Sequence, residues 1–308
     1  MKTNAQTKIR PAVTRRSFMR GAAYGTLGAV IGFDRLDSLA AAGRVAPFAA
    51  PDPASRLILV RDEAAVDEGH LVNAQVVAAM VDRAVQELAG ETDARRAWAR
   101  FFKPEDTVAV KFTHCGWMRV HTEQAVVDAV IARLKGLGIP AGRIHAADGG
   151  QPLKECTALV NIPSVKVHTL TGFACSVKNY INFTGRESSY HGDGNAKLAD
   201  SFLLPDIKGK TRLIVVDFLR PYFGPGPQIN PLHRWDYKGV LAGTDPVAVD
   251  TTALRICQVK RDAFKGEPWP VTPPPRFLAA AEQDYKLGTA DPQKIQLVKL
   301  GWDKDILI

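Results

Sequence analysis

The residue types best suited to chemistry gather in one short segment of the chain. An apolar run ends at Pro163 and is followed closely by Lys166, His168, Thr171 and Lys178. Lysine supplies a positive charge, and histidine gains or loses a proton near neutral pH. Such a group of side chains can bind a carboxylate or phosphate, move a proton, or hold a metal or a covalently attached cofactor. The alternative is a structural histidine among solvated lysines.

The spacing in this segment predicts an anion site at the start of a helix. If a helix begins near Gly172, its first backbone N–H groups have no partner inside the helix and attract an anion. The anionic group of a ligand or cofactor would then be bound by Lys166, Thr171 and Gly172. Lys178 would lie about two turns along the helix. His168 and Lys178 are the candidate catalytic residues.

A second candidate cluster follows an earlier apolar run. His114 and Cys115 come directly after residues 107–112, and His121 is close behind. Ligands of an open α/β sheet bind at the carboxyl ends of the strands, so these side chains could meet His168 there. Imidazole and thiolate groups are ligands for transition metals. We therefore treat His114 and Cys115 as candidate metal ligands.

Alternating strands and helices are expected to position both clusters. Strands are predicted at residues 56–60, 107–112, 143–146, 158–162, 212–216 and 239–241, because these runs are short, apolar and rich in β-branched residues. Helices are predicted at residues 72–88, from residue 122 to residue 136 or 138, and at residues 246–257. Gly90 is the expected C-cap of the first helix, and Asp245 the expected N-cap of the third. This order predicts an α/β layered fold with a mainly parallel sheet and helices on both faces, in a single domain over residues 56–308.

Two aspartates have alternative roles. Asp148 ends a predicted strand before two glycines and is expected to cap that turn, although it could orient a histidine or bind a hydroxyl group. Asp250 lies one turn into the third helix and is expected on its solvated surface, although it could face the site. Residues 184–210 and 217–238 are predicted to be long loops, because they are rich in glycine, proline or polar residues.

The first 42 residues have the pattern of an export signal. Arg15 and Arg16 precede residues 21–33, which carry no charge, and three alanines follow at residues 40–42. The apolar run is shorter than the ~20 residues that span a bilayer. The pattern resembles a twin-arginine signal peptide, so we expect a signal at 1–42, a linker at 43–55, periplasmic localisation and the twin-arginine translocation machinery as a partner. Retention of the signal as an uncleaved anchor is the alternative.

Composition excludes several classes of protein. The 308 residues are 46% hydrophobic and 23% charged, as in a folded globular protein. Much of the net charge of +8 lies in the first 42 residues, and the rest is nearly balanced, so nucleic acid is not an expected partner. The four cysteines include no CxxC pair, so no iron–sulfur cluster is expected. The sequence fixes neither the disulfide pairing nor the oligomeric state.

Three stretches together resemble the domain-of-unknown-function 362 family. They are N-x-P-x-x-K-x-H-x-x-T-G-F-x-x-x-x-K-N at residues 161–179, GTDPVAVD at residues 243–250 and VAVKF at residues 108–112. The resemblance covers about residues 57–260 of the chain. Many members of that family carry a ferredoxin-like iron–sulfur segment, which this chain lacks. The activity of the family is not established, so the resemblance implies no particular reaction.

The chain is also distantly similar to the amino-terminal domain of nickel-pincer lactate racemase. In that family a catalytic histidine is followed ten positions later by the lysine that tethers the cofactor, as His168 is followed by Lys178 here. A further histidine beyond the lysine binds nickel, and His191 lies in the comparable region. His114 and His121 are candidates for the other catalytic histidine. The resemblance implies a nickel or other transition-metal cofactor, with His191 as a metal ligand.

Two functions are expected from these observations, with an inert structural role as the third alternative. In the first, the protein is a cofactor- or metal-dependent isomerase or oxidoreductase that acts on a small carboxylate. His168 would move a proton, and Lys178 would hold the cofactor or the anionic group. In the second, the protein is a periplasmic accessory protein that binds an anion or a metal in the same pocket without turnover. Both functions require a small ligand or metal bound at this site.

Overall fold

The strands of the sheet direct alternate side chains into two apolar cores. The computed structural model describes residues 55–114, 120–150, 153–191, 193–226 and 229–308. In β1 (Ser55–Arg61), Ile58 and Val60 pack into one core, whereas Leu57 and Leu59 pack into the other. Successive side chains of a strand point to opposite faces, so an unbroken apolar run is stable only where both faces are covered.

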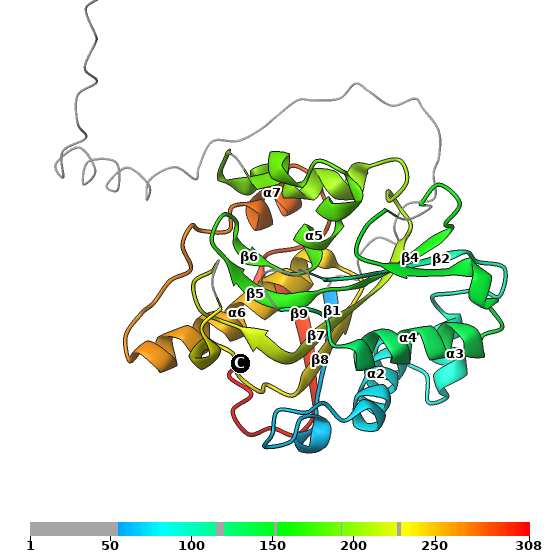
Figure 1. Ribbon diagram of the computed structural model, residues 1–308, viewed down its shortest axis with the longest axis horizontal. Coiled ribbons are helices and arrows are strands. Elements are labelled where there is room, and N and C mark those ends of the chain that lie inside the picture. The colour runs from blue at the N-terminus through cyan, green and yellow to red at the C-terminus, as the bar shows by residue number, and fades with distance from the viewer. Residues whose placement is uncertain (1–54, 115–119, 151–152, 192, 227–228) are drawn as a thin grey trace, which may run out of the picture. The chain divides into compact units, whose positions relative to one another are not determined.

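Helices cover both faces of the sheet, as predicted (Figure 1). One core includes residues of α2 (Ala74–Ala89), α3 (Ala94–Ala99) and α4 (Gln124–Gly136). The other includes residues of α5 (Ser176–Asn179), α6 (Pro246–Lys265) and α7 (Phe277–Gln283). Gly90 ends α2 with a φ of +67°, and Asp245 caps α6 by accepting two backbone hydrogen bonds, which confirms both predicted caps. The described residues all belong to one compact unit.

One mainly parallel sheet contains the nine described strands. Its main path runs in the order β3 (Ile144–Ala147), β2 (Val108–Phe112), β4 (Ala158–Ile162), β7 (Thr211–Tyr222), β8 (Gly239–Gly243), β1 and β9 (Ile295–Gly301). Off this path, β5 (Ser164–His168) pairs with β7 and with β6 (Gly172–Ala174). The β1–β8, β5–β6 and β7–β8 pairs are antiparallel, and the other five pairs are parallel. Because β2, β3 and β4 are parallel neighbours, their carboxyl ends share one edge of the sheet.

Some elements differ from their predicted bounds. β7 continues to Tyr222, so residues 217–222 are strand rather than loop. Phe218 and Leu219 are fully buried there, so packing overrides the turn-like composition. Residues 184–210, predicted as a loop, contain 3₁₀ turns at 187–191 and 193–203. α4 begins at Gln124 without a side-chain cap, because the Thr122 hydroxyl accepts from the N–H of Thr113 and donates to the Ile162 carbonyl instead.

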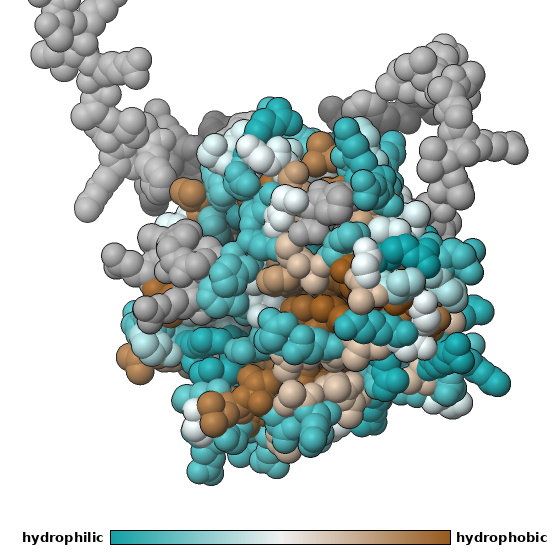
Figure 2. Space-filling model, turned by 45° about the vertical axis from the view of Figure 1, so that its right-hand side comes forward, coloured by the Kyte–Doolittle hydropathy of each residue, from teal (hydrophilic) through white to brown (hydrophobic). Residues whose placement is uncertain are grey.

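The described surface is mixed in character. Hydrophobic residues gather near the centre of the face in Figure 2, with hydrophilic residues around them. Large exposed apolar side chains are scattered over the elements, as is normal for a folded protein; among them are Leu71, Leu170, Leu203, Leu232, Val259 and Phe264. Among the described residues, no helix is both long enough and apolar enough to cross a membrane. The predicted signal, and the linker up to residue 54, lie outside the described residues.

Gly172 makes the turn between β5 and β6 possible. Its φ is +74°, and a Cβ atom at this position would lie 2.0 Å from the carbonyl oxygen of Pro273. We expect Gly172→Ala to destabilise the protein by more than about 2 kcal/mol, because a left-handed backbone costs an L-residue about 1–2 kcal/mol and the carbonyl must also move. Gly90→Ala is the matched control, since Gly90 has a φ of +67° but open space around it. Equal losses of stability in the two variants, measured by thermal unfolding, would contradict this packing argument.

Candidate functional site

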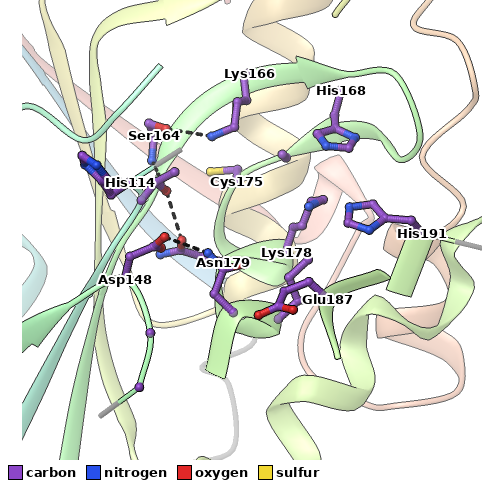
Figure 3. Close-up of a pocket in the computed structure, with 16 residues that line it drawn as sticks. His114, Asp148, Ser164, Lys166, His168, Cys175, Lys178, Asn179, Glu187 and His191 are labelled. Carbon is purple, nitrogen blue, oxygen red and sulfur yellow. Dashed lines mark hydrogen bonds between the residues drawn. The ribbon is translucent and has the colours of Figure 1, made fainter. Parts of the chain in front are cut away.

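A pocket of about 640 Å³ lies at the carboxyl ends of β2 and β3 and beside β5 (Figure 3). It is lined by Thr113, His114, Asp148, Gly149, Gly150, Ser164, Lys166, His168, Ala174, Cys175, Lys178, Asn179, Ile181, Asn182, Glu187 and His191. Its volume is in the range of ordinary small-molecule sites. Its position is the one at which open α/β sheets bind ligands.

Several of the predicted site residues meet in this pocket. β5 contributes Lys166 and His168, α5 contributes Lys178, and a following turn contributes His191. The His168 and His191 rings stack, with centroids 5.4 Å apart and an interplanar angle of 15°. Figure 3 shows His168, His191 and Lys178 grouped at one end of the pocket, and Lys166 farther along it, where its Nζ donates to Ser164 Oγ at 3.0 Å. Two lysines and two histidines therefore share one cavity.

The predicted helix start near Gly172 is wrong. Residues 172–174 form β6, which pairs with β5 as an antiparallel hairpin, and α5 begins only at Ser176. Lys178 therefore lies in the first turn of α5 rather than two turns along a helix. Thr171 and Gly172, predicted to bind a cofactor, do not line the pocket, and the Thr171 hydroxyl donates to the Phe173 carbonyl. β6 pairs with β5, and β5 in turn pairs with β7, which is distant in the sequence; this pairing explains why the glycine starts a strand.

The candidate metal ligands are only partly brought together. His114 lines the pocket and stacks on His121, with ring centroids 4.5 Å apart. Figure 3 places His114 and His191 on opposite sides of the pocket. Cys115 lies outside the described residues. Within the described part of the chain, no group of three or more His, Cys, Asp or Glu residues could hold a metal ion. Metal binding by His114, Cys115 and His191 stays a prediction.

Backbone contacts fix the protonation of His168. Its Nδ1 accepts hydrogen bonds from the backbone N–H groups of Leu170 at 3.2 Å and Thr171 at 3.3 Å. A nitrogen that accepts carries no proton, so the proton of the neutral ring is on Nε2. Burial, followed by the charge of Lys178, lowers the pKa of His168 to about 3. His168 is therefore neutral at pH 7 and offers an N–H donor.

His191 has the complementary arrangement. Burial lowers its pKa, and the charge of Lys178 lowers it further. The backbone and the charge of Glu187 oppose both effects. In a neutral imidazole one ring nitrogen carries a proton and the other has a lone pair. Such a histidine can accept a proton or bind a metal.

A buried ion pair that the sequence analysis missed supports one wall of the pocket. Lys111 Nζ donates to Asp148 Oδ1 at 2.5 Å, to the Phe112 carbonyl at 2.7 Å and to Asn179 Oδ1 at 3.1 Å. The Lys111 side chain is fully buried, and burial lowers its pKa to about 8 although Asp148 opposes the shift. Asn182 donates to the other oxygen of Asp148 at 2.8 Å. Asp148 is thus an oriented carboxylate in the pocket wall. The sequence signal was a lysine inside an apolar strand.

The short helix that carries Lys178 is held from two sides. Asp250, on α6, accepts hydrogen bonds from the N–H groups of Ser176 at 2.6 Å and Val177 at 3.1 Å. Asn161, on β4, donates to the Ser176 carbonyl at 3.1 Å. Asp250 is fully buried, so the expectation of a solvated position is wrong. The first N–H groups of a helix have no partner inside it, and here the carboxylate supplies one.

A sequence model of one protein family matches residues 62–255 of the chain. No curated protein and no solved structure matches the chain. The matched residues contain β2 to β8 and half of α6, and so include every element that lines the pocket. Because the match covers more than half of the chain, the protein belongs to the family described as Domain of unknown function (DUF362).

Proposed function

We propose that the pocket binds a small carboxylate and that the protein acts on it as an isomerase or oxidoreductase. The observation that carries this proposal is the convergence of Lys166, Lys178 and His168 on one cavity. Two ammonium groups and a neutral N–H donor suit the oxygens of a carboxylate. Asp148 and Glu187 also line the cavity, but the charge of Asp148 is paired with that of Lys111, so the two pocket lysines outnumber the one remaining carboxylate. The pocket can therefore attract an anion.

The two stacked histidines take different roles in this proposal. His168 donates from Nε2 to a ligand oxygen, because its Nδ1 is occupied by two backbone N–H groups. His191 accepts the proton or binds a metal, through the ring nitrogen that carries no proton. This division differs from the sequence-based expectation that His168 moves the proton. A group with a pKa of about 3 is a weak base at neutral pH.

A transition-metal cofactor is compatible with the residues present if it brings metal ligands of its own. Lys178 and His191 line the same cavity, so Lys178 could hold such a cofactor covalently while His191 binds its metal. The described residues alone form no site for a bare metal ion. When bound, the metal would supply a Lewis acid or a redox centre beside the carboxylate. A cavity of about 640 Å³ has room for both groups.

The alternative is a periplasmic accessory protein that binds an anion or metal without turnover. One observation favours it: His168, the histidine nearest the two lysines in the sequence, is held neutral and as a donor. Such a residue binds an anion well without moving a proton.

The ligand and metal content of the exported protein tests these functions. Protein exported by its own signal is compared with protein made without residues 1–42, by native mass spectrometry and elemental analysis. We expect a stoichiometric ligand or metal in the exported form, and its loss in Lys178→Ala. Chemical conversion of an added carboxylate identifies an enzyme, whereas its recovery unchanged identifies the accessory role. Preparations that hold no ligand and bind no small carboxylate would contradict both functions.

We also propose export to the periplasm by the twin-arginine route, with the translocation machinery as a partner. Replacement of Arg15 and Arg16 by lysine keeps the charge but removes the arginine pair. We expect the precursor to stay in the cytoplasm while its body still folds, as cell fractionation and immunoblotting would show. Replacement of Arg95 and Arg96, an exposed pair on α3, is the matched control and should not affect export. Normal export of the first variant would refute this route.

A further inference from the structure

The two longest motifs of the family resemblance meet at one buried carboxylate. Asp250 comes from the GTDPVAVD stretch, and α5 comes from the stretch at residues 161–179. We propose that Asp250 is a positioning residue, which holds the first turn of α5 and thereby fixes Lys178 in the pocket. The proposal rests on the proposed function, in which Lys178 binds the anionic group.

The contacts of Asp250 concentrate on the start of α5. Its two oxygens accept the N–H groups of Ser176 and Val177, at 2.6 and 3.1 Å. The Cys175 thiol also forms a hydrogen bond with the Asp250 carboxylate. Lys178 is the residue that directly follows Val177. The carboxylate therefore holds three successive residues that lead up to Lys178.

α5 cannot keep its position without such contacts. It has only four residues, and a helix of this length is not stable by itself because helix nucleation is unfavourable. Its other polar support comes from Asn161, which donates to the Ser176 carbonyl and also accepts from Asn179 at 2.7 Å, and from Lys111 and Thr113, which donate to Asn179 Oδ1 at 3.1 and 3.0 Å. Those contacts hold the Ser176 carbonyl and the Asn179 side chain, so loss of the Asp250 contacts would leave the N–H groups of Ser176 and Val177 without their carboxylate partner. Because Lys178 lies on the first turn of α5, the exposure of its side chain to solvent would then change.

Titration of Asp250 offers a readout in the unmodified protein. Burial raises its pKa to about 7, although hydrogen bonds from Val177, Ser176 and Cys175 oppose the shift. The charged group that acts on it is Asp245, which raises the pKa further. Burial, and then the charge of Asp250, raises the pKa of the Cys175 thiol, which therefore stays protonated. Above pH 7 the ionised carboxylate holds α5 firmly, and below pH 7 its hold weakens.

Acetylation of Lys178 in Asp250→Asn tests the proposal without any ligand. A limiting amount of acetic anhydride is added to folded protein, and the rate at each lysine is measured by peptide mass spectrometry. We expect Lys178 to react several-fold faster than in the wild type, relative to the exposed Lys208. Asp245→Asn is the matched control at pH 8.5, where Asp250 is ionised with or without the charge of Asp245, because Asp245 is also buried but caps the start of α6. It should lower the melting temperature and leave the Lys178 rate unchanged.

An unchanged Lys178 rate in folded Asp250→Asn would overturn the proposal. If that variant does not fold, wild-type protein is titrated from pH 5.5 to 8.5 by NMR. We expect the backbone amides of Ser176 and Val177 and the side chain of Lys178 to shift with a common midpoint near 7. A Lys178 signal that does not follow the two amides would refute the positioning role. Failure of wild type to bind malonate would refute only the proposed function.

Discussion

Lys178→Ala is expected to weaken binding of malonate, a simple carboxylate probe, by roughly 10- to 100-fold. A hydrogen bond to a charged group contributes about 1.5–3 kcal/mol, and each 1.4 kcal/mol is about tenfold in affinity. Folding stability should change little, because Lys178 is only partly buried and its loss leaves no void in the apolar cores. Calorimetric titration and thermal unfolding of one preparation give both quantities.

Lys208→Ala is the control for this substitution. Lys208 is an exposed lysine that does not line the pocket, so its removal should change neither affinity nor stability. A large fall in melting temperature of Lys178→Ala with unchanged malonate affinity would show that Lys178 has a structural role.

Asp148→Ala is expected to destabilise the protein by about 3–5 kcal/mol, because it leaves the charge of Lys111 buried without its partner. Asp148→Asn is the matched variant and should lose less, since an amide oxygen still accepts from Lys111. Urea unfolding at pH 7 measures both. Equal stabilities of Asp148→Ala and wild type would contradict the assignment of this buried pair.

The same lysine predicts a pH dependence of stability. In the folded protein the pKa of Lys111 is about 8, whereas the unfolded value is about 10.4. Between these values the unfolded state binds more protons, so Lys111 makes stability rise with pH. The cost of its charge is present below pH 8 and is relieved as pH rises toward 10. Lys111→Met should remove this rise. If the stability of the variant and that of the wild type had the same slope against pH, this prediction would be contradicted.

The layered fold could be predicted because its signals are local. The apolar runs at β1, β2, β4 and β8 give short strands between helices with clear caps such as Gly90 and Asp245. The β5–β6 hairpin could not, because it depends on pairing with β7 and on the backbone of Pro273 above Gly172. Those contacts join residues that are distant in the sequence.

The site could be predicted only in part, for a similar reason. His168 and Lys178 follow the exit of an apolar strand, which in an α/β sheet indicates the ligand-binding edge. Lys111 was missed and Asp250 was expected on a solvated surface, because a charged residue in an apolar strand or helix can be interpreted only with its partner. Asp148, the partner of Lys111, is 37 residues away in the sequence. The N–H groups that donate to Asp250 belong to residues that are 74 and 73 positions away.

The claim that Lys166 and Lys178 share one anion-binding pocket is tested most directly by protection from labelling. Each lysine of the wild type is acetylated under limiting reagent at increasing malonate concentration, and rates are measured by peptide mass spectrometry. The structure predicts that malonate slows acetylation of Lys166 and Lys178 together, along one saturation curve, while the exposed Lys135 and Lys208 react as before. Protection of neither pocket lysine at saturating malonate, or equal slowing of all four, would contradict it.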